Sequence, residues 1–202
     1  MKRILFCLLL LAALAAHAWA ADESAAGKAE RPLVRIETTM GNILIELWPG
    51  KAPITVENFL AHVEYGHYEG TIFHRVVEDF VIQGGGFEPG LEFREPPFPP
   101  IGNEARSDVR NTRGTVAMAR TEDPHSARAQ FYINLMNNAA LDHRGEARGR
   151  WGYTVFGRVK RGMRTVEAIH RLPTTTVRGM PDVPEEPPVI TAVRVIESGQ
   201  VN

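Results

Sequence analysis

The chain has 202 residues, with 23 lysines and arginines against 24 aspartates and glutamates, so its formal charge at pH 7 is -1. This length suits one domain with a sizeable core, and the sequence shows no internal repeat and no second compositional zone. The charges of both signs are interspersed without a basic patch, which excludes a nucleic-acid-binding protein from our expectations.

The first twenty residues have the pattern of a cleavable signal peptide. Lys2-Arg3 gives a positive start, residues 4–16 are almost entirely apolar, and Ala18-Trp19-Ala20 places small residues before a cleavage site ahead of Ala21. The apolar run is shorter than the roughly 20 residues that span a membrane, so we expect release rather than a retained anchor. We therefore predict a periplasmic protein, or an extracellular one in a cell without an outer membrane, and no membrane association after cleavage.

Cleavage at this site changes the chemistry of the exported chain. It removes Cys7, the only cysteine, so the mature protein has no disulfide and depends on its core for stability. It also lowers the number of lysines and arginines from 23 to 21 against 24 acidic residues, which gives a formal charge of -3. Residues 21–31 are small and polar, and we predict a flexible leader there, followed by a folded domain over residues 32–202.

The first predicted elements of that domain are a hairpin and a helix. Residues 33–39 and 42–48 are rich in β-branched and apolar side chains, and Gly41 between them can adopt the positive φ of a tight turn. Pro53 suits the first turn of a helix that we expect to end at Gly66. The apolar residues of this helix have the i, i+3, i+4, i+7 spacing of one buried face: Val56, Phe59, Leu60 and Val63.

The rest of the domain is predicted to be mainly short strands, with one more helix between Gly162 and Pro173. Without regular strand–helix alternation, this pattern favours an antiparallel barrel or sandwich over a doubly wound nucleotide-binding fold. Residues 96–100 are interpreted as a rigid proline-rich connector, and residues 180–188 as an exposed loop. The predicted strands cover residues 72–76, 80–83, 115–119, 130–133, 154–159 and 189–196.

Most familiar catalytic patterns are missing from this chain. Residues 84–86 are glycines, but the sequence after them lacks the dinucleotide-binding spacing. His62 and His67 are five positions apart, which does not stack them on one helix face as a zinc pair requires. Ser126 lies in a polar loop without a nucleophile elbow. A metal- or serine-dependent hydrolase that uses these residues or His125 is a distant alternative, and we expect neither a metal nor a cofactor.

One stretch suits a reaction that needs no nucleophile. Residues 73–86 read FHRVVEDFVIQGGG and place one arginine and one glutamine among aromatic and β-branched neighbours. Rotation about a prolyl peptide bond breaks no covalent bond, although its barrier is about 18–20 kcal/mol. An apolar pocket favours the twisted, less polar amide, and a cationic donor stabilises the lone pair that becomes localised on the prolyl nitrogen.

The same stretch resembles the signature of the cyclophilin family of peptidyl-prolyl isomerases. The resemblance runs in order from about Pro32 to Ile196. It implies an all-β fold, a closed eight-stranded antiparallel β-barrel capped by two α-helices, and activity on X-Pro bonds in unfolded segments of exported proteins. The other segments that carry it are VENFL (56–60), GTIF (70–73), NTRGTVAMAR (111–120), AQFYIN (129–134) and VFGRV (155–159).

The resemblance also implies which residues form a proline site. Arg75 matches the family's catalytic arginine, whose guanidinium donates to the prolyl nitrogen as the bond turns. Phe80, Tyr132 and Leu141 match the floor and walls of the proline pocket, with Val81 at its edge. Tyr132 stands where phenylalanine is usual, and its extra hydroxyl needs a hydrogen-bond partner if it is buried.

Five further matches concern the substrate backbone and the pocket rim. Gln83 and Gln130 match residues that hydrogen-bond the substrate backbone and orient the arginine. Ala119 and Arg120 match the strand along which the substrate main chain pairs, so Arg120 is expected to act largely through its backbone. Tyr153 stands where many relatives carry histidine.

The resemblance leaves one alternative function open, and one departure from the family pattern predicts a response to an inhibitor. Ala140 stands where eukaryotic relatives have a tryptophan that holds cyclosporin, so we predict weak inhibition by that drug. The alternative function is a holdase or adaptor that binds proline-containing peptides in the same groove without significant turnover. We expect the protein to be a monomer, with extended proline-containing polypeptides as its partners.

Overall fold

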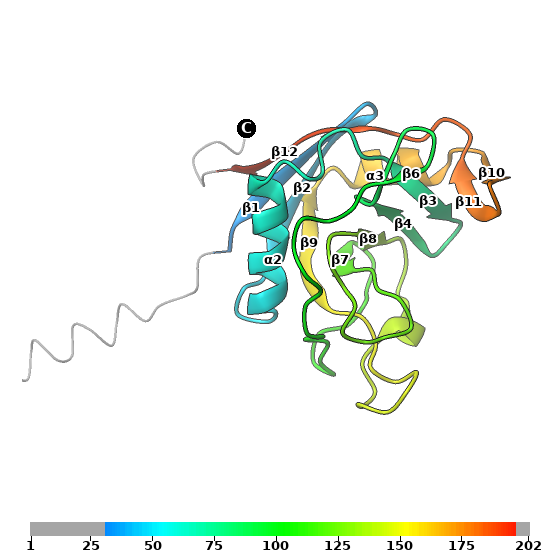
Figure 1. Ribbon diagram of the computed structural model, residues 1–202. Coiled ribbons are helices and arrows are strands. Elements are labelled where there is room, and N and C mark those ends of the chain that lie inside the picture. The colour runs from blue at the N-terminus through cyan, green and yellow to red at the C-terminus, as the bar shows by residue number, and fades with distance from the viewer. Residues whose placement is uncertain (1–30, 197–202) are drawn as a thin grey trace, which may run out of the picture. The chain divides into compact units, whose positions relative to one another are not determined.

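The computed structural model describes residues 31–196 (Figure 1). The predicted signal peptide, and the predicted leader apart from Arg31, lie outside the described residues. Within residues 31–196, no helix has both the length and the apolar character that a membrane span requires.

Eight strands form one curled antiparallel sheet, and Figure 1 shows β12, β1 and β2 side by side at one edge. β1 and β2 pair as the predicted hairpin, from Leu33 opposite Glu46 to Thr38 opposite Gly41. Met40 lies in the turn, where its N–H donates to Thr38 Oγ1 over 3.1 Å. The strands, in spatial order, are β12 (Ile190–Ile196), β1 (Leu33–Thr38), β2 (Gly41–Leu47), β9 (Val155–Arg161), β7 (Thr115–Met118), β8 (Phe131–Asn134), β4 (Val81–Gly84) and β3 (Phe73–Val77).

The sheet is open, so the prediction of a closed barrel is wrong. Its edge strands β12 and β3 do not form a ladder, and the only pairing near this gap within residues 31–196 is an isolated bridge between Ile72 and Val189. Pro188 accepts a hydrogen bond from the Phe73 N–H over 3.0 Å, but it has no N–H to donate in return. A proline two residues before β12 therefore limits further pairing at this edge.

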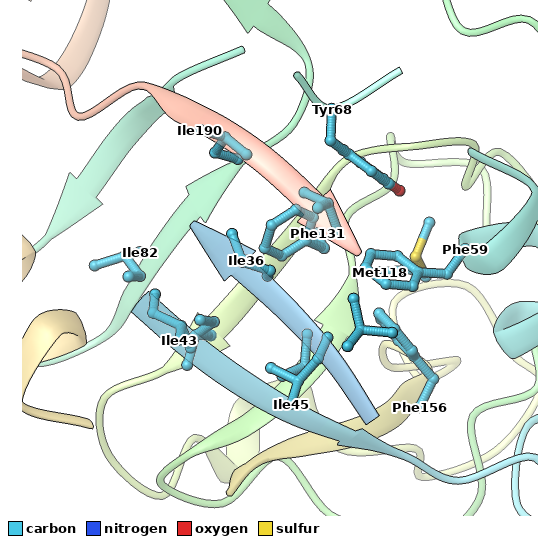
Figure 2. Close-up of a cluster of buried hydrophobic side chains, with 14 of the residues drawn as sticks. Ile36, Ile43, Ile45, Phe59, Tyr68, Ile82, Met118, Phe131, Phe156 and Ile190 are labelled. Atoms are coloured by element: carbon cyan, nitrogen blue, oxygen red, sulfur yellow. The ribbon is translucent and has the colours of Figure 1, made fainter. Parts of the chain in front are cut away.

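The two sides of the sheet have different surroundings because side chains alternate along each strand. Inward residues join one large buried core, in which Phe59 of the helix packs against Phe131 and Phe156 with ring centroids 5.9 and 5.1 Å apart (Figure 2). The intervening residues join a second, smaller cluster on the other side of the sheet. Its buried members are Val81, Val109, Ala117, Tyr132 and Val155.

Two α-helices pack on the sheet within the described residues, as predicted. α2 (Pro53–Glu64) begins with proline in its first turn and ends before Gly66, which adopts a φ of +78°. α3 (Met163–His170) begins after Gly162, where a φ of +93° and a Cβ position only 2.3 Å from the Asn42 carbonyl oxygen exclude other residues. Val166 and Ile169 are the fully buried residues of α3.

Two small hairpins and a short helix complete the described chain. β5 (Phe87–Glu88) pairs with β6 (Glu92–Phe93), and the 3-10 helix η1 spans Ala139–Leu141. β10 (Thr174–Val177) pairs with β11 (Met180–Pro184), so the prediction of a loop over residues 180–188 is wrong for its first five residues. The turn between them uses left-handed backbone at Arg178 and Gly179.

Candidate active site

A β-bulge in β3 determines where the predicted catalytic arginine lies. Phe73 and Val76 both belong to the main core, although three positions separate them. A register shift between Phe73 and Arg75 accommodates the extra residue, and it places Arg75 opposite Gln83 of β4. The bulge therefore directs Arg75 to the side of the sheet where the smaller cluster lies.

Nine of the ten predicted site residues line one cavity of about 150 Å³ on that side. The volume is about five times the ~30 Å³ that a water molecule occupies in the liquid, which is room for a small ring. Val81 and Tyr132 are buried, whereas Arg75 and Phe80 are partly exposed. The lining residues are Arg75, Phe80, Val81, Gln83, Ala119, Arg120, Tyr132, Leu141 and Tyr153.

A chain of hydrogen bonds connects Arg75 with the tenth predicted residue, Gln130. Nη1 of Arg75 donates to Gln83 Oε1 over 3.4 Å, and Nε2 of Gln83 donates to Gln130 Oε1 over 2.9 Å. Gln130 lies over Gly86, where a Cβ atom would come within 2.4 Å of the glutamine side chain. The last glycine of the GGG run thus provides the space that Gln130 needs to reach Gln83.

The pocket floor is fixed by a buried polar contact. The Tyr132 hydroxyl donates to Asn111 Oδ1 over 2.8 Å, and Asn111 in turn donates through Nδ2 to the Leu141 carbonyl over 3.0 Å. Burial, and to a lesser extent the neighbouring Tyr153, raises the pKa of Tyr132 well above its ordinary value, so the hydroxyl stays a donor. The extra hydroxyl at this position is therefore satisfied, and it ties two pocket residues together.

The pocket rim is held by Arg120. Its guanidinium lies 4.3 Å from the centre of the Tyr153 ring, and Nε donates to the Gly152 carbonyl over 3.1 Å. Nη1 donates to the Thr121 carbonyl over 2.7 Å. The Arg120 backbone N–H and C=O make no hydrogen bond with any residue from 31 to 196. This leaves the main chain of Arg120 available for pairing, as the resemblance implies.

Two larger hollows continue from the same pocket. One of about 340 Å³ shares Gln83, Ala119 and Arg120 with it and also contacts Gln130. The other, of about 830 Å³, shares Arg120, Leu141 and Tyr153 with the pocket and extends past Ala140. The site is therefore the centre of a groove that can take residues on both sides of a proline.

The residues of the hydrolase alternative do not converge, although Ser126 lines the hollow of about 340 Å³ beside the pocket. His62 and His67 are buried with ring centroids 5.2 Å apart, and burial, then the charge of His62, lowers the pKa of His67 to about 4. Ser126 Oγ donates to the Asp123 carbonyl over 2.7 Å, and no histidine within residues 31–196 is hydrogen-bonded to that hydroxyl. His125 packs against Trp151 instead.

Two residues near the site were missed from the sequence. Asn111, which anchors Tyr132, lies in a matched segment but gives no sign of its role there. Asp182 lies 3.8 Å from Arg75, measured from Oδ2 to Nε, and belongs to the segment predicted as an exposed loop. Only the β10–β11 hairpin, which packs along β3, brings Asp182 to the site.

Comparison with known proteins identifies the family of this chain. Residues 33–195 match the family model described as cyclophilin type peptidyl-prolyl cis-trans isomerase/CLD. The chain is 52% identical over 163 residues to the peptidyl-prolyl cis-trans isomerase cyp18 of Streptomyces antibioticus, covering 81% of this chain and 98% of that protein. It is 47% identical over 165 residues to peptidyl-prolyl cis-trans isomerase B of Escherichia coli strain K12, covering 82% and 100% respectively.

A solved structure supports the fold. The crystal structure of a cyclophilin type peptidyl-prolyl cis-trans isomerase from Cryptosporidium parvum aligns with a TM-score of 0.68 at 24% sequence identity, covering 83% of this chain and 98% of that one. Fold, sequence relatives and family model agree over nearly all of the described residues. The chain therefore belongs to the cyclophilin-type peptidyl-prolyl cis-trans isomerases and is an enzyme of that class.

Proposed function

We propose that this isomerase accelerates rotation about X-Pro bonds in unfolded or extended segments of exported proteins, with Arg75 as the donor to the prolyl nitrogen. The observation that supports the proposal most is the hydrogen bonding of the Arg75 guanidinium. Nη1 donates to Gln83, whereas Nη2 donates no hydrogen bond to any residue from 31 to 196. A donor is thus left available at the wall of the small cavity.

The reaction follows from this arrangement. The proline ring enters the cavity above Phe80 and Tyr132, and the flanking backbone pairs with the main chain of Arg120. As the peptide bond twists, its resonance is lost and the nitrogen lone pair becomes localised. A hydrogen bond from Arg75 to that nitrogen is present only near the twisted state, so it lowers the barrier rather than tightening the ground state. A charged donor contributes about 1.5–3 kcal/mol, which is roughly 10- to 100-fold in rate.

The predicted signal sequence supports exported proteins as clients. Uncatalysed X-Pro isomerisation takes tens to hundreds of seconds, so it limits the folding of newly exported chains. The groove beside the pocket is open on both sides, which suits extended segments with loose side-chain selection. Ala140 lines the larger hollow in place of a tryptophan, which supports weak rather than tight cyclosporin binding.

An isomerisation assay on an Ala-Pro peptide tests the proposal, with peptide binding measured in parallel. We expect the wild-type enzyme to accelerate the exchange and Arg75→Ala to lose roughly 10- to 100-fold in kcat/KM while still binding the peptide. If wild-type protein binds the peptide but is no faster than buffer, the holdase alternative replaces the mechanism. If turnover is unchanged by a chelator and by Ser126→Ala, the hydrolase alternative is excluded.

A further inference from the structure

The β10–β11 hairpin brings a second charged group to the catalytic arginine. β11 packs along β3, the edge strand that carries Arg75 (Figure 1). Asp182 Oδ2 lies 3.8 Å from Arg75 Nε, and the two side chains are 38% and 35% exposed. Both groups therefore remain accessible to solvent, and they face each other beside the pocket that Arg75 lines.

The backbone conformation at Asp182 suits an aspartate at this position and directs its side chain. Asp182 has a φ of +61°, a left-handed conformation that aspartate and asparagine tolerate better than other side-chain-bearing residues. The hairpin register shifts between Thr175 and Val177, opposite this part of β11. Val183, the next residue, is only 2% exposed and anchors the strand. The irregular backbone turns the carboxylate toward β3 while the neighbouring residue stays in the core.

The three guanidinium nitrogens of Arg75 then have three different surroundings. Nε is the nitrogen nearest the carboxylate of Asp182, Nη1 donates to Gln83, and Nη2 donates no hydrogen bond within residues 31–196. Arginine has a planar, rigid fork of donors, so holding two of its nitrogens determines the direction of the third. The hydrogen bond to Gln83, over 3.4 Å, does not by itself prevent the guanidinium from rotating about that contact.

We propose that Asp182 is a positioning residue for the isomerase reaction: it faces the Nε side of Arg75 and thereby directs Nη2 into the proline pocket. The inference rests on the proposed role of Arg75 as donor. Asp182 does not touch the substrate, and it acts through Arg75 alone. Because the pair is partly exposed, its contribution is modest and decreases as salt screens the two charges.

The test compares isosteric substitutions at two aspartates in the same kind of backbone. Asp182→Asn removes the charge but keeps the tolerance for positive φ. Asp79→Asn is the matched control, because Asp79 also has a positive φ, +49°, in the β3–β4 turn, and its carboxylate lies 3.8 Å from His170 rather than from Arg75. kcat and KM on an Ala-Pro peptide are measured at low and high salt, together with the thermal midpoint of each variant.

We expect Asp182→Asn to lower kcat by about two- to fivefold, the range of a partly exposed ion pair, with KM nearly unchanged. The loss should shrink at high salt, and Asp79→Asn should match the wild type. In an Arg75→Ala background, Asp182→Asn should cause no further loss, because the aspartate acts through the arginine. A thermal midpoint that stays within a few degrees separates positioning from loss of the hairpin.

Three results would overturn the inference: unchanged or higher kcat in Asp182→Asn, an equal loss in the Arg75→Ala background, or an equal loss in Asp79→Asn. These outcomes are distinct from failure of the proposed function. If Arg75→Ala itself keeps wild-type activity, the donor role is wrong. If Arg75→Ala is impaired and Asp182→Asn is not, only the positioning role is wrong.

Discussion

Gly86 shows how a residue without a side chain contributes to this site. A Cβ atom there would lie within 2.4 Å of Gln130, the last member of the hydrogen-bond chain that begins at Arg75. The other two glycines of the run lie against different groups, since a Cβ on Gly84 or Gly85 would come within 3.0 or 2.9 Å of aromatic rings. The glycine run is therefore a packing requirement at the end of β4 rather than a phosphate-binding loop.

We expect Gly86→Ala to displace Gln130 and to lower kcat/KM by about two- to tenfold, the value of one neutral hydrogen bond. Because the clash involves a flexible side chain, the free energy of unfolding should change by less than the ~1–3 kcal/mol of ordinary overpacking. The peptide assay and urea unfolding measure the two effects. Gly50→Ala is the control, since its Cβ meets nothing within 4 Å. Full activity in Gly86→Ala would show that Gln130 does not support the site.

The site residues that can be predicted from the sequence lie close together along the chain, whereas the one that cannot be predicted lies far from them. Arg75, Phe80 and Gln83 lie in one run of fourteen residues, which is enough to identify the pocket. Asp182 reaches the same site only through the packing of β11 on β3, and no local pattern records that contact. Its segment contains three prolines and two glutamates after the aspartate, which favours a loop when it is read alone.

At the scale of elements, α2 begins without a cap of its own. Ala52 occupies the N-cap position and makes no side-chain hydrogen bond there. The Glu104 carboxylate, fifty residues away, takes over this role: it accepts from the Ile54 N–H over 3.2 Å and from the Thr55 N–H over 2.7 Å. Capping by a distant loop couples the start of α2 to the segment that precedes β7, and the sequence gives no sign of it.

We expect Glu104→Ala to lower the free energy of unfolding by about 1–2 kcal/mol, because it leaves helix N–H groups unpaired and removes a negative charge from the helix start. Glu104→Gln should lose less, since its amide oxygen still accepts one bond. Urea unfolding monitored by circular dichroism gives both values. Glu57→Ala, on the exposed side of the same helix, should be nearly neutral. Equal stability in Glu104→Ala and Glu57→Ala would contradict the capping role.

At the scale of the whole molecule, local sequence patterns predict the individual strands and helices better than they predict whether the sheet closes into a barrel. The six strands predicted after the hairpin and the second helix are all present, with bounds shifted by one or two residues. Whether the sheet closes into a barrel depends on pairing between β12 and β3, which lie more than a hundred residues apart in the sequence. It also depends on Pro188, which has no N–H to donate at this gap. Alternation within a strand says nothing about which edges meet, so the open sheet could not be predicted.

Buried histidines make the stability of the whole fold depend on pH. Burial is the largest cause that lowers the pKa of His67 and of His74 to about 4, against 6.5 when exposed, and it also lowers the pKa of His62. As pH falls from 6.5 toward 4, the unfolded chain binds protons that the folded chain does not. The folded state therefore loses stability over this window and gains none above it.

We expect the free energy of unfolding to be constant above about pH 7.5 and to fall by up to ~1.4 kcal/mol per pH unit for each of His67 and His74 between pH 6.5 and 4. Urea unfolding at pH 7.5, 6.5, 5.5 and 4.5 measures this slope. His125→Gln is the control, since that histidine is exposed. A free energy that does not change between pH 6.5 and 4.5 would show that the buried histidines are protonated in the folded state as well.

The most direct test of the whole account is the rate at which Arg75→Lys isomerises an Ala-Pro peptide, compared with wild type and Arg75→Ala. Lysine keeps the positive charge but lacks the planar fork that divides its contacts among Asp182, Gln83 and the pocket. We expect a kcat/KM for Arg75→Lys that lies close to that of Arg75→Ala and roughly 10- to 100-fold below wild type, with peptide binding retained. A lysine variant that turns over at nearly the wild-type rate would contradict this expectation.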